Sequence, residues 1–218
     1  RHINNRIAFN DKRLTGKKYW IFDLDNTLYA SSSGIFNEID KRMKKFISKE
    51  FNISEENAFS LQKKLYRQYG TTLYGLIKYY KIDPIKFLDY VHDISLYNVE
   101  QSNILKVSLE NLPGKKIIFT NGDAKWAKKI LDALGIKNSF DGIFDIIKAN
   151  YIPKPQKETY TNFIKNFDID PSKAVFFEDT EKNLEQAHNL GITTILIDEK
   201  LKLKKNDNAK TFVDFKFK

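Results

Sequence analysis

Hydrophobic positions follow two different periods in the first half of this chain. A short apolar run at 19–23 ends in the acidic and turn residues DLDNT, as a buried strand does at its carboxyl end. From 36 to about 107 the apolar residues recur every three or four positions, which is the spacing of one helix face. Ser54, and Asp83 followed by Pro84, are typical of helix starts. The pattern predicts one strand followed by a block of about four helices.

The second half of the chain alternates between strand and helix periods. Apolar runs of strand length are separated by amphipathic segments, two of which end at Gly135 and Gly191, residues suited to a left-handed helix end. The expected elements are strands at 115–121, 143–147, 174–178, 193–197 and 211–217 and helices at 124–134, 156–167 and 181–190. This alternation predicts right-handed βαβ crossovers, and hence an α/β fold with a parallel sheet and helices on both faces.

The helical block is therefore an insertion after the first strand of the sheet. Residues 1–17 are polar and basic without a sustained period, and we expect them to form an N-terminal arm. Residues 18–30 and 108–218 are expected to form the core domain, and residues 31–107 an inserted all-α cap domain. Tyr29 and the serines that follow it fall at the junction, where a connector is expected whether or not it also gates a site.

Composition and charge narrow the chemistry. With no cysteine and 3 histidines, the chain has no disulfide, thiolate nucleophile or cysteine-ligated metal, and we expect His188 to be packed rather than a ligand. No apolar run approaches the ~18 residues that span a bilayer, and we expect a cytoplasmic protein without a membrane partner. The net charge of +9 favours anionic partners. The lysine-rich stretches lack interleaved exposed aromatics, so no specific nucleic-acid partner is expected.

Polar residues stand at one end of four segments of the predicted sheet. They follow its first, second and fourth strands and precede the helix at 156–167. A single residue of this kind is usually turn chemistry or a helix cap. Because the carboxyl ends of parallel strands meet at one edge, their joint occurrence predicts a shared ligand site. The residues are Asp23, Asp25, Thr120, Asn121, Gly122, Lys154, Glu178 and Asp179.

The four carboxylates of this set would repel one another in a partly dry cleft unless a cation compensates them. Oxygen ligands without cysteine or a suitable histidine select a hard ion, and Mg²⁺ fits best. Lys154 adds a fixed positive charge, and Thr120 with the backbone amides of Asn121 and Gly122 supplies donors. Together these groups predict a socket for a phosphate dianion.

A carboxylate beside a bound phosphate is a plausible nucleophile, because an aspartyl phosphate divides one difficult displacement into two easier ones. Only one of Asp23 and Asp25 can serve. We expect Asp25 to donate a proton to the leaving alcohol and later to accept one from the attacking water, while Asp23 stays ionised against the metal. Such acid–base help contributes about 100- to 10,000-fold in rate.

These residues resemble the four motifs of the haloacid dehalogenase superfamily in order and spacing, over about 19–214. The matching positions are DLDNT at 23–27, the threonine at 120, KP at 154–155 and ED at 178–179. The resemblance implies a Rossmann-like core with a helical cap. It also implies Asp23 as nucleophile, Asp25 as acid and base, Thr120 and Lys154 on the phosphate, and Mg²⁺ held by Asp23, the Asp25 backbone carbonyl and Asp179, with Glu178 nearby.

Asp25 argues against a true dehalogenase, because those enzymes lack an acid at this position and need no metal. The resemblance implies hydrolysis of phosphate esters instead. The segments DLDNTLYASSSGIFNEIDKRM, YGTTLYGL, FTNGDAKWA and FEDTEKNL are moreover similar to the pyrimidine 5′-nucleotidase group, which implies a monophosphate such as UMP or CMP as substrate.

Aromatic residues are frequent in the predicted cap. Helical spacing favours burial for most of them, including Phe36, Tyr66, Tyr79, Tyr80 and Tyr97. Near the breaks at Gly70 and Gly75, however, we expect the substrate contacts Tyr69, Thr72 and Tyr74.

Two alternatives stay open at this stage. The same chemistry suits a phosphatase of phosphoglycolate or a sugar phosphate, or a phosphosugar mutase in which a phosphosugar replaces water. A basic binding protein with a relic site is the alternative from another class, although no motif residue is missing. The sequence leaves the nucleobase and the oligomeric state open.

Overall fold

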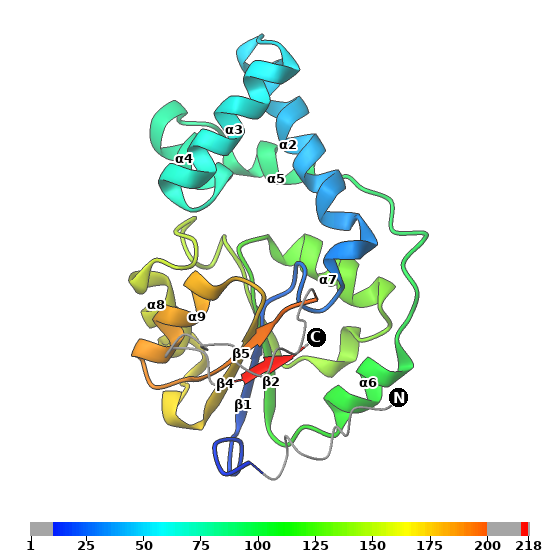
Figure 1. Cartoon of the computed structure of the whole chain (residues 1–218), viewed down its shortest axis with the longest axis vertical. Helices are drawn as coiled ribbons and strands as arrows, with labels where there is room; N and C mark the ends of the chain where they lie inside the picture. Colours follow the sequence, from blue (N-terminus) through cyan, green and yellow to red (C-terminus); the bar gives the residue numbers. More distant parts are fainter. Residues whose placement is uncertain (1–10, 200–214, 218) are drawn as a thin grey trace, which may run out of the picture.

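The computed structural model describes residues 11–199 and 215–217. A parallel sheet of six strands lies in the lower half of the view in Figure 1. The strand order is β3-β2-β1-β4-β5-β6. The strands are β1 (Tyr19–Phe22), β2 (Lys115–Phe119), β3 (Gly142–Phe144), β4 (Ala174–Glu178), β5 (Thr193–Ile197) and β6 (Phe215–Phe217). Because β1 lies between β2 and β4, the carboxyl ends of these three strands are neighbours.

The register of the central strands explains their continuous apolar runs. Ile21 pairs with Ile117 on one side and with Phe176 on the other. Successive residues of a strand face opposite sides of the sheet, so Ile21 and Phe22 enter two different core clusters. Strands that are buried on both faces have no polar face to alternate with.

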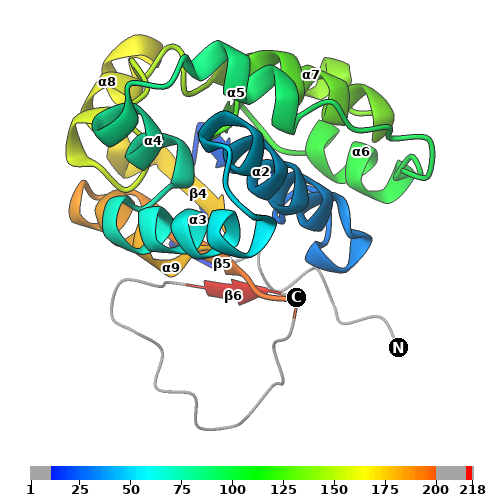
Figure 2. The same cartoon turned by 90° about the horizontal axis from the view of Figure 1, so that it is seen from above.

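Helices cover both faces of the sheet (Figure 2). They are α6 (Asn103–Glu110), α7 (Ala124–Ala133), α8 (Lys157–Phe167) and α9 (Glu181–Asn189). Trp126 and Ile130 of α7 pack in the cluster that holds Phe22, whereas Phe163 of α8 and Leu184 of α9 pack in the cluster on the opposite face. The prediction of an α/β parallel sheet with helices on both faces is confirmed.

Four further helices follow β1 and lie beyond the carboxyl ends of the strands (Figure 1). They are α2 (Ile35–Phe51), α3 (Glu55–Tyr69), α4 (Thr72–Tyr80) and α5 (Pro84–Val91), preceded by the short 3₁₀ helix η1 (Ser31–Ser33). The Ser54 and Asp83 side chains accept backbone hydrogen bonds from Asn57 and Ile85, as their predicted capping roles require. The inserted helical block is confirmed. Helix α6 runs across the predicted domain boundary at 107/108, and that boundary stays a prediction.

Two expected strands end earlier than the apolar pattern suggested. The second strand ends at Phe119, and β3 ends at Phe144 instead of continuing to residue 147. The buried Asp145 side chain accepts hydrogen bonds from the amides of Ala124 and Lys148. The bond from the Lys148 amide holds the residues after Phe144 in a turn, so the chain leaves the sheet at this point.

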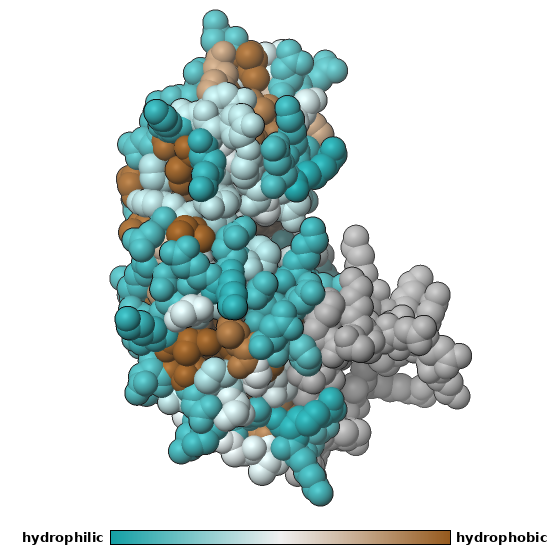
Figure 3. All heavy atoms as spheres, turned by 90° about the vertical axis from the view of Figure 1, so that its left-hand side faces the viewer, coloured by the Kyte–Doolittle hydropathy of each residue, from teal (hydrophilic) through white to brown (hydrophobic). Residues whose placement is uncertain are grey.

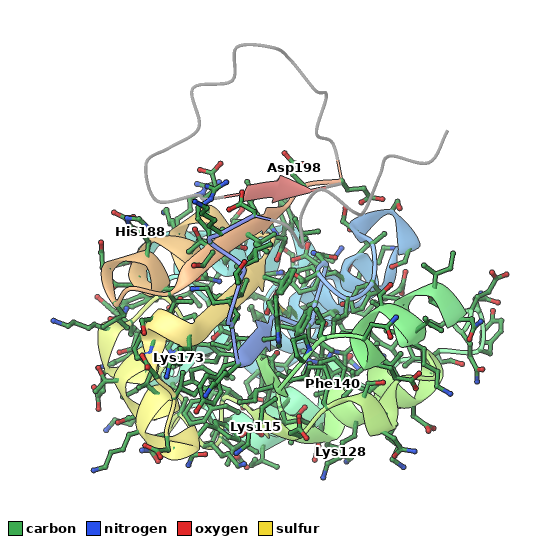
Figure 4. The ribbon with its side chains drawn as sticks, turned by 90° about the horizontal axis from the view of Figure 1, so that it is seen from below. Lys115, Lys128, Phe140, Lys173, His188 and Asp198 are labelled. Atoms are coloured by element: carbon green, nitrogen blue, oxygen red, sulfur yellow. The ribbon has the colours of Figure 1, made fainter. Side chains whose placement is uncertain are left out.

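His188 is exposed, so the expectation that it is packed is wrong (Figure 4). The buried face of α9 consists of Asn183, Leu184 and Ala187, and the next position is rotated by about 100° from Ala187. No helix within 11–199 and 215–217 has both the length and the hydropathy needed to cross a membrane.

Residues 1–10 of the predicted arm and the lysine-rich stretch at 201–210 lie outside the described residues. Residues 11–16 of the arm form a bend and turns. The expected edge strand is confirmed over Phe215–Phe217, and its first positions, 211–214, are also outside the described residues.

Candidate active site

The turn after β1 carries the first two predicted site residues. The amides of Thr27 and Leu28 donate to the Leu24 carbonyl, which reverses the chain directly after the strand. Asn26 adopts φ 62°, a left-handed conformation that asparagine tolerates better than most residues. Leu24 is completely buried, whereas Asp23 and Asp25 both face the cavity described below. The local sequence DLDNT thus places two carboxylates at the strand edge.

Lys154 lies at the centre of the site. Its ammonium group donates to Asp23 Oδ1 at 2.9 Å, to Glu178 Oε2 at 2.9 Å and to the Phe119 carbonyl at 2.7 Å. The side chain is only 1% exposed. Burial alone would lower the pKa of Lys154, but the charges of Asp23 and Glu178 raise it above its ordinary value. Lys154 is therefore a fixed cation that joins three strand ends.

Asp23, Glu178 and Asp179 form a group of carboxylates that together could hold a metal ion. One oxygen of each lies within 4.8 Å of the others. Burial raises the pKa of Asp23 to about 7, and the charge of Glu178 adds to the rise while Lys154 opposes it. Burial and the charge of Asp23 also raise the pKa of Asp179 to about 6. One lysine thus leaves the negative charge of three carboxylates incompletely compensated, and this oxygen-only donor set fits a hard divalent cation such as Mg²⁺.

The three carboxylates differ in how many hydrogen bonds they accept from other groups of the protein. Glu178 accepts hydrogen bonds from Lys154, from Asn183 Nδ2 and from the amides of Asp179 and Thr180. Asp23 and Asp179 share a weaker partner, the Thr27 hydroxyl, which is 3.1 Å from Asp23 Oδ2 and 3.4 Å from Asp179 Oδ1. Asp23 and Asp179 consequently have more capacity left for a ligand than Glu178 has.

The loop after β2 is tied to the loop before α8. The Lys154 amide donates to Asn121 Oδ1 at 2.8 Å, and Asn121 Nδ2 donates back to the Lys154 carbonyl at 3.2 Å. The Gly122 amide donates to the Thr120 hydroxyl at 3.0 Å. The Gly122 amide, one of the two backbone amides expected to serve as donors to a phosphate, is thus engaged within the protein. The Asn121 side chain joins the two loops and fixes the position of Lys154.

Asp25 lies beside this group and has its own partners. Its Oδ1 accepts hydrogen bonds from the Tyr29 hydroxyl and, at 2.9 Å, from Trp126 Nε1. Sequence reasoning did not assign contacts in the site to Trp126, nor to Thr27 and Asn183. All three stand in motif segments quoted above, DLDNTLY, FTNGDAKWA and FEDTEKNL, but only the tertiary structure shows which side chains meet.

A cavity of about 930 Å³ connects the strand ends to the inserted helices. All predicted site residues line it, including Tyr69, Thr72 and Tyr74. The Thr72 side chain is buried, and its hydroxyl is 3.5 Å from the Gln62 carbonyl. Tyr69 and Tyr74 are half-buried and meet edge to face at 6.4 Å. The cavity therefore has charged groups at its floor and two phenol rings on its helical wall.

Several cap aromatics that helical spacing assigned to the core are instead exposed, namely Tyr66, Tyr79, Tyr80 and Tyr97. The buried face of α4 comprises Thr72, Leu73, Gly75 and Leu76 and ends before Tyr79. Tyr79 and Tyr80 pack on one another and on partly buried neighbours instead. The face of the molecule shown in Figure 3 is mostly hydrophilic, with limited apolar areas.

The fold and the site define an α/β protein with a cluster of buried charged groups at the carboxyl ends of parallel strands, where such folds bind ligands. The family description of haloacid dehalogenase-like hydrolases matches residues 18–191, and the chain belongs to this family.

Known proteins similar to the chain include two curated yeast proteins. Phosphate metabolism protein 8 of Saccharomyces cerevisiae is 28% identical over 197 residues, covering 83% of this chain and 61% of the relative. Enolase-phosphatase E1 of Kluyveromyces lactis is 28% identical over 120 residues, covering 54% of this chain and 50% of the relative. The chain thus spans between half and two thirds of the length of these curated relatives.

Among solved structures, the HAD-hydrolase YfnB from Bacillus subtilis bound to magnesium is similar to the chain. The TM-score is 0.60 at 14% identity, and the match covers 92% of this chain and 94% of the other. At this identity the likeness concerns the fold, including the inserted helices.

Proposed function

We propose that the protein is a Mg²⁺-dependent phosphomonoesterase that forms an aspartyl phosphate on Asp23. The observation that carries the proposal is the position of the Asp23 carboxylate, with Lys154 on one oxygen, Thr27 on the other and Asp179 beside it. A phosphate dianion needs positive charge at this edge and a nucleophile held in place. Names of the yeast relatives, which refer to phosphate metabolism and to a phosphatase, agree with this substrate class.

Asp23, Asp179 and the backbone carbonyl of Asp25 would hold the metal ion. Mg²⁺ held there would supply positive charge that keeps Asp23 ionised and offsets the negative charge of a phosphate. Glu178 has a different role in this proposal. Because its oxygens accept from Lys154 and from the start of α9, it fixes the lysine and the loop that carries Asp179.

In the first half of the reaction, a carboxylate oxygen of Asp23 attacks phosphorus, and the bond from phosphorus to the ester oxygen breaks. Asp25 gives its proton to that ester oxygen, so the alcohol leaves neutral. Thr120 and Lys154 hold the transferring group and stabilise the charge that its oxygens carry in the transition state.

In the second half, the oxygen of a water molecule attacks phosphorus, and Asp25 accepts a proton from that water. The bond from phosphorus to Asp23 breaks, which releases inorganic phosphate and restores both carboxyl groups to their starting states. The inserted helices over the cavity limit the access of bulk water during the transfer.

The substrate we propose is a nucleoside monophosphate, with pyrimidine nucleotides as the first candidates. The volume of about 930 Å³ accommodates a nucleotide, and Tyr69 and Tyr74, which line the same cavity as the strand ends, offer aromatic faces to a base. Residues 31–107 act in this proposal as the cap domain that carries the base contacts.

A phosphate-release screen tests both the phosphomonoesterase activity and the choice of a nucleotide as substrate. UMP, CMP, AMP, phosphoglycolate and glucose 6-phosphate are incubated with the protein, with Mg²⁺ and with EDTA. We expect Mg²⁺-dependent release, fastest from the pyrimidine nucleotides, and none above background with Asp23→Asn. Preference for phosphoglycolate or the sugar phosphate would contradict the nucleotide assignment only. Transfer of phosphate between sugars without release would indicate a mutase. Inactivity on all substrates would contradict the proposal that the protein is a phosphomonoesterase.

A further inference from the structure

Two donors outside the four motif positions converge on one oxygen of Asp25. Trp126 Nε1 donates to Asp25 Oδ1 at 2.9 Å, and the Tyr29 hydroxyl donates to the same oxygen. Within the described residues, no protein donor bonds the second oxygen, Oδ2. The carboxyl group is therefore held from one side, and its free oxygen belongs to a residue that lines the cavity.

The Trp126 ring is itself fixed from two directions. Its backbone amide donates to Asp123 Oδ1 at 3.1 Å, which caps the start of α7. Its ring stacks on the His92 imidazole with centroids 4.8 Å apart and planes inclined by only 6°. His92 Nδ1 lies 3.2 Å from Asp123 Oδ1, so the two groups that hold Trp126 also contact each other. The indole has little freedom to turn its N–H away from Asp25.

His92 directly follows α5, whereas Trp126 stands in the first turn of α7. The stacked pair therefore joins the inserted helices to the core beside Asp25. Tyr29, the second donor, stands just before η1, where the chain leaves for the inserted helices. Both donors to Asp25 thus occupy positions at which the two parts of the molecule meet.

The other tryptophan shows what a purely structural arrangement looks like in this chain. Trp20 is as well buried as Trp126, and its Nε1 donates to the Pro113 backbone carbonyl at 2.7 Å. A buried indole N–H needs an acceptor, and a carbonyl meets that need without involving a reactive group. The indole N–H of Trp126 instead donates to a carboxyl group of the site.

We propose that Trp126 and Tyr29 are positioning residues that orient the Asp25 carboxyl group, so that Oδ2 carries the proton delivered to the leaving oxygen. This inference rests on the proposed function. Proton donation needs the acid within hydrogen-bond reach and in line with its acceptor, and a carboxyl group free to rotate about its Cβ–Cγ bond is seldom so aligned. Two hydrogen bonds to a single oxygen fix that rotation and leave the other oxygen available.

The test compares Trp126→Phe and Tyr29→Phe with Trp20→Phe, the matched control for loss of a buried indole. Two substrates are used for each variant. An alkyl phosphate, glycerol 1-phosphate, has a poor leaving group that needs a proton, whereas p-nitrophenyl phosphate has a leaving group that departs without one. The measured quantity is kcat/KM, because it covers the steps only up to formation of the aspartyl phosphate. It excludes the later step in which Asp25 accepts a proton from water.

We expect Trp126→Phe and Tyr29→Phe to lower kcat/KM for glycerol 1-phosphate about tenfold or more and for p-nitrophenyl phosphate less than twofold. Trp20→Phe should leave the ratio of the two substrates at its wild-type value, even where its Tm falls as far as that of Trp126→Phe. If Trp126→Phe does not fold, Tyr29→Phe, which removes one hydroxyl group, decides the question.

Equal losses on both substrates in both site variants would overturn the positioning role, and so would no loss on either substrate. Either result leaves the proposed function standing as long as the wild type hydrolyses both esters and Asp23→Asn hydrolyses neither. A wild type that releases no phosphate from these two esters or from any substrate of the screen overturns the proposed function and the positioning role with it.

Discussion

Lys154 and Asp23 are 131 positions apart in the sequence, yet Lys154 Nζ donates to Asp23 Oδ1 at 2.9 Å. The parallel sheet brings them together, because β1 and the loop before α8 reach the same edge. A buried ammonium group between two carboxylates cannot be removed without leaving uncompensated charge. This relationship connects the stability of the fold with the chemistry of the site.

Replacement of the lysine by an apolar residue of similar length should affect both properties. We expect Lys154→Met to lower the free energy of unfolding by about 3 to 5 kcal/mol, because Asp23 and Glu178 stay buried without their cation. Phosphate release should fall about 100-fold or more. Urea unfolding and a release assay measure the two effects. Lys173→Met, at an exposed lysine 3.7 Å from Asp170, is the control and should change stability by less than about 0.5 kcal/mol (Figure 4). Equal effects of the two substitutions would contradict this account.

Removal of the charge at Asp23 should stabilise the metal-free protein. Because burial raises the pKa of Asp23 from 3.8 to about 7, the folded state resists ionisation of this group more than the unfolded state does. The contribution of Asp23 to the free energy of unfolding is therefore greatest below the pKa of the unfolded state and is lost as the pH rises through about 7.

In EDTA, Asp23→Asn should thus unfold at a higher urea concentration than wild type at pH 7.5, by at least about 1 kcal/mol, since one pKa unit corresponds to 1.36 kcal/mol. The difference should shrink as the pH falls toward 5, where the wild-type carboxyl group is protonated. Unfolding curves at four pH values provide the measurement. A difference that grows toward low pH has the wrong sign for a raised pKa.

Loss of the carboxylate at Asp179 should weaken the binding of Mg²⁺. We expect Asp179→Asn to need at least about tenfold more Mg²⁺ for half-maximal phosphate release, because a charged oxygen ligand is replaced by a neutral one. Asp170→Asn provides the matched control, since Asp170 is a carboxylate that caps a 3₁₀ turn away from the cavity. Titration of activity with Mg²⁺ decides, and an unchanged midpoint in Asp179→Asn would show that this carboxylate does not hold the metal.

Glycine at position 114 should be essential for the approach of β1 to β2. Its φ is +94°, and a Cβ atom there would lie 2.3 Å from the Lys18 carbonyl oxygen. Gly191 has a similar φ of +87°, but nothing lies within 4 Å of its Cβ position. Gly191→Ala should therefore cost about 1 to 2 kcal/mol from backbone strain, and Gly114→Ala about 3 kcal/mol or more from strain and overlap. Thermal unfolding of both variants tests this ranking.

Much of this structure could be predicted from the sequence because its signals are local. Ser54 and Asp83 cap helices as their neighbours indicate, and the apolar runs form strands wherever both faces are covered. The strand that the apolar pattern predicts to residue 147 ends at Phe144, because burial of Asp145 depends on a bond to Ala124, 21 positions away, as well as on the local bond to Lys148.

The candidate site was predicted as a set of positions but not as a network. All the predicted residues line one cavity, since parallel strand ends converge. The mutual hydrogen bonds of Asn121 and Lys154 could not be predicted, because they depend on the approach of two loops. Trp126 fits the apolar face of its helix equally well whether its N–H reaches Asp25 or not, so periodicity alone gives no hint of that contact.

The central claim is that Asp23 receives the phosphoryl group. The most direct measurement is mass spectrometry of peptides from protein quenched in acid during steady-state turnover with Mg²⁺ and the best substrate of the screen. The account predicts one phosphoryl group on the peptide that contains Asp23 in the wild type, and none with Asp23→Asn. Continued turnover with this peptide unmodified at every quench time would contradict it.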